Sequence, residues 1–173
     1  NGKLLLTGEV NLKLKNSLGR GELIDAEWRR LQQGTQSLNI KLGWPFLFNT
    51  RVGVEGSFGL YKRDTSFINV QQNLGLQYLM KGTDYLKAFY ENRSSNLLST
   101  KGLENILTLP DYADIRANLY GIEANLTRLD YRLNPRKGYR ILARLGTGTR
   151  NIQKNPALKP ELYDQLTLRS VQY

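Results

Sequence analysis

The sequence predicts an all-β protein, an antiparallel up-and-down β-barrel that spans a membrane. The first observation is a period-two pattern: from Leu4 to Leu14 the even positions are apolar and the odd positions are largely polar, and the pattern recurs along the chain. Successive side chains of a strand point to opposite faces, so each such segment has one apolar and one polar face. The second observation is that most links are short. The third is the length of the alternating segments.

The alternation divides the chain into nine expected strands, most of them joined by links of a few residues. Sequential strands with short links pair as antiparallel neighbours. No helical period interrupts them, which argues against a parallel βαβ organisation. The expected strands cover residues 3–15, 21–32, 36–47, 51–62, 66–80, 84–93, 117–131, 138–148 and, more weakly, 163–172.

One connection, residues 94–116, is longer than the others and has no clear period. Its apolar residues could form a short helix that ends at Pro110, or a loop packed against the barrel rim. Its carboxylates, Asp111 and Asp114, are expected to be solvated. Long connections of this kind are usually functional or partly mobile. The chain as a whole, residues 1–173, is predicted to be a single partial barrel domain.

Segment length separates a membrane barrel from a soluble β-sandwich. Strands of soluble proteins have about five or six residues, whereas tilted strands that cross a bilayer need about nine to eleven. Ile68 to Met80 alternates for longer than that. Aromatic residues also lie toward the ends of the apolar stripes, where membrane interfaces favour them. These aromatic residues are Trp28, Trp44, Phe46, Phe48, Tyr78, Tyr90 and Tyr139. We therefore favour the barrel.

The chain has 25 Lys and Arg against 15 Asp and Glu, a formal net charge of +10, and neither cysteine nor histidine. The basic residues alternate with acidic ones and form no block, so we expect no nucleic-acid partner. Without cysteine and histidine there is no disulfide, thiol nucleophile, usual zinc ligand set or Ser-His-Asp triad. We therefore predict no catalytic, cofactor-binding or metal-binding residues, and no enzymatic activity.

Two further expectations concern the chain's relation to a membrane and to its precursor. No run of about 18 apolar residues is present, so no transmembrane helix is predicted. The chain leads directly from Asn1 into a strand without a signal peptide. We therefore expect that it begins within a larger precursor or after processing.

Three segments resemble a known family. Residues 16–22 are similar to the tight N-x-L-G-x-G turn between the first two barrel strands of the BamA/TamA-type outer-membrane assembly proteins, in the bacterial surface antigen superfamily. Residues 43–48 look like the proline-aromatic end of that family's third strand. Residues 129–138 resemble its D-x-R-x-x-P-x-x-G turn. The family-like turn positions are Gly19, Gly21, Pro45, Asp130, Arg132, Pro135 and Gly138.

The resemblance implies a bacterial outer-membrane barrel of about sixteen strands, of which this chain would hold about the first eight or nine. Periplasmic POTRA domains and the C-terminal barrel half would lie outside the chain. The implied function is assembly and insertion of outer-membrane proteins, or translocation. The implied partners are outer-membrane lipids, unfolded outer-membrane client proteins, and periplasmic lipoproteins or other subunits of a complex. No cofactor is implied.

A weak seam between the first and last strands of such a barrel could template an incoming strand by β-augmentation. In the family this seam is the lateral gate. Carried over, the gate strand here would be Lys3 to Lys15, where backbone groups do most of the work. The gate-strand residues of this hypothesis are Lys3, Leu4, Leu6, Gly8, Val10 and Leu12.

Three other functions stay open. The first is an outer-membrane transport channel in which lumen-facing charges line a polar passage. The second is a barrel that anchors a separate enzymatic domain, such as a patatin-like lipase. The third, less expected, is a soluble β-sandwich binding module. The lumen-facing charges of the channel hypothesis are Glu9, Lys13, Asp25, Glu27, Arg29, Lys41 and Glu55.

Overall fold

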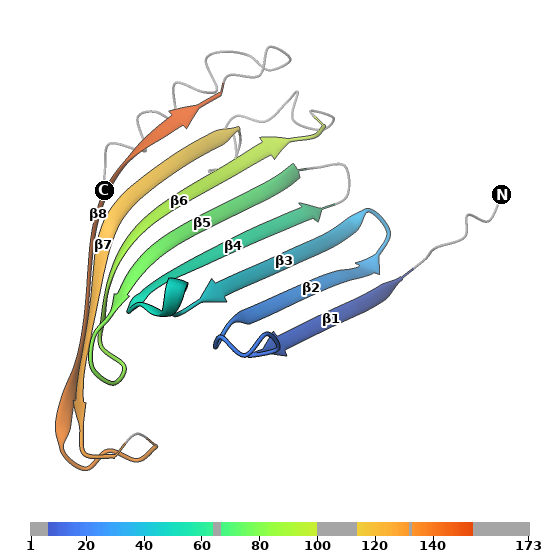
Figure 1. The fold of residues 1–173 in the computed structure, drawn as a ribbon. Helices are drawn as coiled ribbons and strands as arrows, with labels where there is room; N and C mark the ends of the chain where they lie inside the picture. The colour runs from blue at the N-terminus through green and yellow to red at the C-terminus, as the bar shows by residue number, and fades with distance from the viewer. Residues whose placement is uncertain (1–6, 64–66, 100–113, 132, 154–173) are drawn as a thin grey trace.

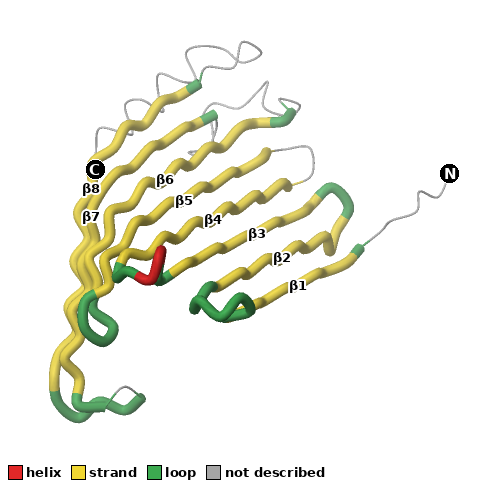
Figure 2. Tube along the Cα trace, in the orientation of Figure 1, coloured by secondary structure: helices red, strands yellow, loops and turns green. Residues whose placement is uncertain are grey.

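The computed structural model describes residues 7–63, 67–99, 114–131 and 133–153, which form one antiparallel sheet. Its eight strands follow in chain order, each paired with the next (Figure 1). Figure 2 shows one short helical turn, the 3-10 turn η1 (Leu47–Asn49), between the third and fourth strands. The strands are β1 (Gly8–Lys15), β2 (Leu23–Gln32), β3 (Thr35–Trp44), β4 (Val52–Arg63), β5 (Phe67–Leu79), β6 (Tyr85–Leu97), β7 (Ile115–Leu129) and β8 (Gly138–Ile152).

The register places like residues side by side, which gives the sheet an apolar and a polar face. Trp28 of β2 pairs with Leu38 of β3, which pairs in turn with Leu60 of β4. One position away, on the opposite face, Arg29 pairs with Ser37. Because side chains alternate along a strand, this register keeps the two sets apart across the sheet.

The sheet is a single curved layer (Figure 1). Its polar face is the concave one, because a basin on that side is lined by polar-face residues. This basin, of about 640 Å³, is bounded by polar-face residues of every strand from β3 to β8. The apolar face carries most of the exposed large hydrophobic side chains, Leu76 and Ile122 among them. Among the described hydrophobic residues only Phe89 is buried, and it lies on the polar face. The described residues therefore build a wall without a conventional hydrophobic core.

The coarse fold prediction is confirmed: the described chain is all-β, antiparallel and up-and-down. The sheet is open, with β1 and β8 as its two edges, so closure into a barrel remains a prediction. The expected ninth strand, residues 163–172, lies outside the described residues. The same holds for Asp111, for the possible helix before Pro110, and for the predicted site residues Lys3, Leu4, Leu6 and Arg132.

Several strand ends differ from the prediction. β3 ends at Trp44, not at residue 47, because Pro45 has no N–H for a ladder and the chain then turns through η1 with Phe48 at a φ of +52°. β8 continues to Ile152, past the predicted end at residue 148. A Cβ on Gly148 would lie 2.1 Å from the Asn118 carbonyl oxygen, so glycine allows close pairing there.

The long connection is shorter than expected, because β6 runs on to Leu97 and β7 begins at Ile115. Asp114, expected to be solvated, is buried instead. Its carboxylate accepts the Leu97 N–H at 2.9 Å, and its carbonyl oxygen accepts the Gln153 N–H at 2.7 Å. This residue therefore ties together the ends of three strands. No helix among the described residues is long and apolar enough to cross a membrane.

Candidate functional site

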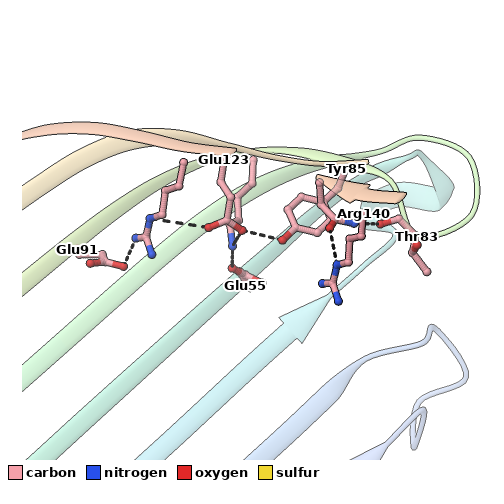
Figure 3. A network of polar contacts seen from close by, with 9 residues as sticks. Glu55, Thr83, Tyr85, Glu91, Glu123 and Arg140 are labelled. Carbon is pink, nitrogen blue, oxygen red and sulfur yellow. Dashed lines mark hydrogen bonds and ion pairs between the residues drawn. The ribbon is translucent and has the colours of Figure 1, made fainter. Parts of the chain in front are cut away.

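A network of ion pairs on the concave face joins residues of β4, β6, β7 and β8 (Figure 3). Lys87 of β6 lies between two carboxylates, with its Nζ atom 3.0 Å from Glu55 Oε1 and 2.8 Å from Glu123 Oε1. The Lys87 side chain is 15% exposed and the Glu123 side chain 9%. Charges with so little contact with water are stable only when they are paired.

The pair between Lys87 and Glu55 passes over β5, because β5 has a glycine at that point. Gly75 pairs with Glu55 on one side, and a Cβ there would lie 2.8 Å from Glu55 Cγ and 3.2 Å from Lys87 Cδ. Any side chain at this position would separate the two charged groups. Because Gly75 has no side chain, Lys87 of β6 can reach Glu55 of β4 across β5, although these two strands are not neighbours.

Arg144 of β8 extends the network. Its guanidinium group donates to Glu91 and lies 3.8 Å from Glu123 Oε2. The Tyr85 hydroxyl donates to Glu123 Oε1 at 2.7 Å. The three carboxylates of the network thus each have a cationic partner. This arrangement neutralises charge and holds strands together.

Phe89 lies on the same face against two glycines. A Cβ on Gly121 would lie 2.5 Å from Phe89 Cζ, and one on Gly146 would lie 3.4 Å from it. Arg144 covers the ring, with its Cζ atom 4.0 Å from the ring centroid. An aromatic ring packed over glycines protects strand positions that have no side chain of their own. This explains why Phe89, a buried hydrophobic residue, lies on the polar face.

Asp84, in the turn before β6, clamps that strand to β7. Its buried carboxylate accepts the Thr127 N–H at 2.8 Å and forms an ion pair with Arg128. The hydrogen bond from Arg128, aided by the one from Thr127, lowers the pKa of Asp84 below its usual value. The clamp extends the contact between the two strands beyond the first residue of β6, Tyr85.

Asn125 lies at this end of the concave face, between Thr83 and Arg140. It is buried, donates from Nδ2 to the Thr83 carbonyl oxygen at 2.8 Å, and accepts from Arg140 Nε at 3.1 Å. A turn and two strands therefore meet at one amide side chain.

The predicted turn between β1 and β2 is held by its own side chains. Gly19 and Gly21 have φ values of +73° and +75°, which glycine adopts readily. Asn16 Oδ1 accepts the Gly21 N–H at 2.7 Å. Glu22 is 1% exposed, and its carboxylate accepts the Leu18 N–H. That hydrogen bond is the main cause that lowers the pKa of Glu22.

Pro45 connects this turn to the next turn at the same end of the sheet. A Cβ on Gly21 would lie 3.1 Å from Pro45 Cγ, so the proline packs on the glycine. Two of the three family-like segments are therefore neighbours in space. The sequence motifs alone did not predict this contact.

The third family-like turn joins β7 and β8. The Asp130 N–H donates to the Lys137 carbonyl oxygen at 3.1 Å, and Asp130 Oδ1 accepts the Arg136 N–H at 3.0 Å. Backbone N–H donors, that of Lys137 first, lower the pKa of Asp130. Gly138 has a φ of +114° and lies so close to Arg128 that no Cβ would fit. Pro135 is exposed in the turn.

The predicted gate strand forms one edge of the sheet. β1 pairs with β2 along its described length, and its other side has no partner strand among the described residues. Val10 and Leu12 are exposed on the apolar face. Gly8 faces the Trp28 ring, which a Cβ would contact at 3.6 Å. Nothing in this geometry tests the gate role, which stays a prediction.

Sequence reasoning missed Phe89, Tyr85 and Asp84 as organising residues. A signal for the first was present, because Gly75 and Gly121 interrupt the polar stripes at positions that flank Phe89 in the register. Asp84 lay in a link and gave no pattern. Among the described residues no group of His, Cys, Asp or Glu could hold a metal ion.

Comparison of the chain with protein-family models, curated proteins and solved structures found no match. The resemblance to the BamA/TamA-type proteins therefore rests on the three sequence segments alone.

Proposed function

We propose that this chain forms part of the wall of a transmembrane β-barrel in the bacterial outer membrane. The observation that carries the proposal is a single-layer sheet with an apolar convex face that no other described element covers. In a soluble fold, such a face packs against a second layer. Lipid would cover it instead, while the concave face with its charges would line the interior.

The slope of the apolar band supports this proposal. The hydrogen-bonded row that contains Trp28, the last apolar residue of the β2 stripe, reaches β8 at Asn151. That position is six residues past Leu145, where the β8 stripe ends. The row of Ile24, at the other end of the β2 stripe, reaches β8 at Thr147, eight residues past Tyr139. The band thus descends across the six steps from β2 to β8.

This shift gives the angle by which the strands tilt away from the normal to the apolar band. A shift of six to eight residues over six strand-to-strand steps is about 1.2 residues per step. With a rise of about 3.3 Å per residue and a distance of about 4.8 Å between neighbouring strands, the tilt is about 40°. Strands of transmembrane barrels tilt by about 35–45°. A horizontal slab of lipid would therefore match the band on all these strands.

Within such a barrel, we propose a role in assembling or inserting outer-membrane proteins. The support is the outer edge of β1, which has no partner strand among the described residues and could pair with an incoming client strand, together with the three family-like turns. Its partners would be outer-membrane lipids, unfolded client proteins, and periplasmic lipoproteins or other subunits.

A transport channel is the second candidate, and the concave face favours it. Its charges and amides would line a polar passage in a closed barrel. Ion conductance of the full-length protein without any effect on client insertion would favour the channel. The enzymatic-anchor hypothesis gains no specific support from the described residues.

The membrane placement is tested with a matched pair of substitutions on β5. Leu76→Arg puts a charge on the convex face, and Gln77→Arg puts the same charge on the concave face one residue away. We expect Leu76→Arg to destabilise the protein in lipid vesicles by about 2–4 kcal/mol. Gln77→Arg should change stability much less. Equal effects of the two substitutions would contradict the lipid-facing assignment.

The assembly role is tested by locking strands with disulfides in the full-length protein. One cysteine pair joins β1 to the last strand of the complete barrel. The control pair, Leu12→Cys with Ala26→Cys, joins register partners of β1 and β2. We expect oxidation of the first pair to stop client assembly reversibly, and oxidation of the control to leave it unchanged. Normal assembly with the first pair locked would count against a gate.

A further inference from the structure

The basin on the concave face differs in chemistry from the ion-pair network beside it. Its lining includes two arginines and no carboxylate. The remaining polar lining is made of amides and hydroxyls, including Asn39, Tyr61, Asn69 and Gln71. Its volume of about 640 Å³ falls within the range of small-molecule sites, about 300–1,000 Å³.

The two arginines share one row of the sheet. Arg93 of β6 pairs with Ala117 of β7, which pairs with Arg150 of β8. The arginines therefore start from strands that are two spacings apart, about 10 Å. The small alanine between them leaves room for a group that both guanidinium groups can reach. Arginine binds phosphate and carboxylate groups with paired hydrogen bonds.

Arg93 has donors available for such a group. Its ion pair with Glu91 is 3.5 Å long, and its side chain is 65% exposed. Glu91 is also held by Arg144. A guanidinium group has five N–H donors, and one long ion pair uses few of them.

The rest of the lining fits a hydroxyl-rich molecule. Asn and Gln side chains both donate and accept hydrogen bonds, as sugar hydroxyls do. Ser95 donates to Asn69 Oδ1 at 2.6 Å, which holds that amide in place. Tyr61 contributes an aromatic ring whose centroid lies 6.1 Å from that of Phe67. An acidic peptide would need its charges matched along its length, and the basin has its cations at one row only.

We propose that this basin binds an anionic saccharide, with Arg93 and Arg150 holding its phosphate or carboxylate and the amides of β3 and β5 contacting its hydroxyls. The site needs only the curved sheet, so it does not depend on a role in client assembly. In a closed barrel it would lie in the lumen.

The test is calorimetric binding of glucose 6-phosphate, glucuronate, glucose and inorganic phosphate to the full-length protein in detergent. We expect saturable binding of both sugar acids, with weaker binding of glucose and of phosphate. Arg93→Ala and Arg150→Ala should each weaken the sugar acids about tenfold. Ala117→Leu should weaken them similarly without removing a charge, because it fills the space between the arginines.

Arg116→Ala is the matched control, because Arg116 precedes Ala117 on β7 and lies on the opposite face. It should leave binding unchanged, and circular dichroism should show that each variant keeps its strands. Absence of saturable binding, or an equal loss in Arg116→Ala, would overturn the proposal. Tighter binding of a hexaglutamate peptide than of either sugar acid would assign the site to a peptide instead.

Discussion

The two ends of the concave face use charge in opposite ways. At one end Lys87 and Arg144 are placed among three carboxylates, and the Lys87–Glu123 ion pair is largely shielded from water. At the other end Arg93 is mostly exposed and has only a long ion pair. A shielded ion pair therefore lies at the centre of the network that holds strands together, whereas the exposed Arg93 has hydrogen-bond donors available to a ligand.

The largest expected difference between the two ends is in the stability lost when a glycine is replaced by alanine. A Cβ on Gly121, under Phe89, would lie 2.2 Å from the Leu145 carbonyl oxygen, so Gly121→Ala has to push β7 and β8 apart. We expect a loss of about 3 kcal/mol or more in the free energy of unfolding. Urea unfolding in lipid vesicles, followed by tryptophan fluorescence, measures it.

Gly59 of the basin is the matched control. A Cβ there would lie 3.4 Å from Asn39 Oδ1, a tight contact with the end of a side chain that can move. Gly59→Ala should therefore change stability by about 0.5 kcal/mol or less. Similar losses for the two substitutions would mean that the ends do not differ in packing.

The second prediction removes the central cation. Lys87→Met leaves Glu55 and Glu123 close together with no lysine between them. Because Glu123 is nearly buried, we expect a loss of about 3 kcal/mol. Adding Glu123→Gln should restore part of it, since the like charges no longer repel.

Lys41 provides the control for this prediction. It lies on the same face and forms no ion pair within the described chain. Lys41→Met should stay within about 0.5 kcal/mol of the parent protein. If the double variant were no more stable than Lys87→Met alone, the lysine would act through packing and not through charge.

These two ends also show what sequence can and cannot predict. The alternation of residues such as Leu74, Leu76 and Tyr78 predicted the strands and their faces, because the side-chain period is a local property. Gly19 and Gly21 predicted a turn, because the backbone conformation that glycine allows is also a local property. The Lys87–Glu55 pair was not predictable, because it joins strands that are not neighbours and depends on the register at Gly75.

Phe89 illustrates a second limit. It occupies a polar-face position, so alternation assigned it no packing role, and only the register brings it beside Gly121. The basin likewise needed the register, since Arg93 and Arg150 are far apart in the chain. Local pattern therefore predicts elements and faces, whereas contacts across the sheet require the pairing of every strand.

The third prediction concerns acid and the clamp beyond the ion-pair end. The pKa of Asp84 is lowered from 3.8 by Arg128 and by the Thr127 N–H. The carboxylate therefore stabilises the fold above pH 3.8, and this contribution is lost as the pH falls through the lowered value. Between pH 3.8 and the lowered pKa, the free energy of unfolding should fall less steeply with decreasing pH in Asp84→Asn than in the parent protein.

Arg128→Gln should flatten the same interval, since Arg128 is the main cause of the lowered pKa. Arg116→Gln is its control, because Arg116 lies on the same strand and face at the other end of β7. A parent-like acid profile in Arg128→Gln would show that the backbone donor alone sets the titration of Asp84.

The smallest expected effect is that of Arg93→Ala on stability, about 0.5 kcal/mol or less, because its ion pair is long and exposed. Added salt should change the effects of substitutions at the two ends of the face differently. In about 1 M salt the Debye length is about 3 Å, so any contribution of Arg93 should vanish. The loss caused by Lys87→Met should largely persist, because Lys87 and Glu123 are shielded from solvent. If salt removed both effects alike, the charges at the two ends would be equally exposed in solution, and the distinction between a structural network and a ligand-binding basin would fail.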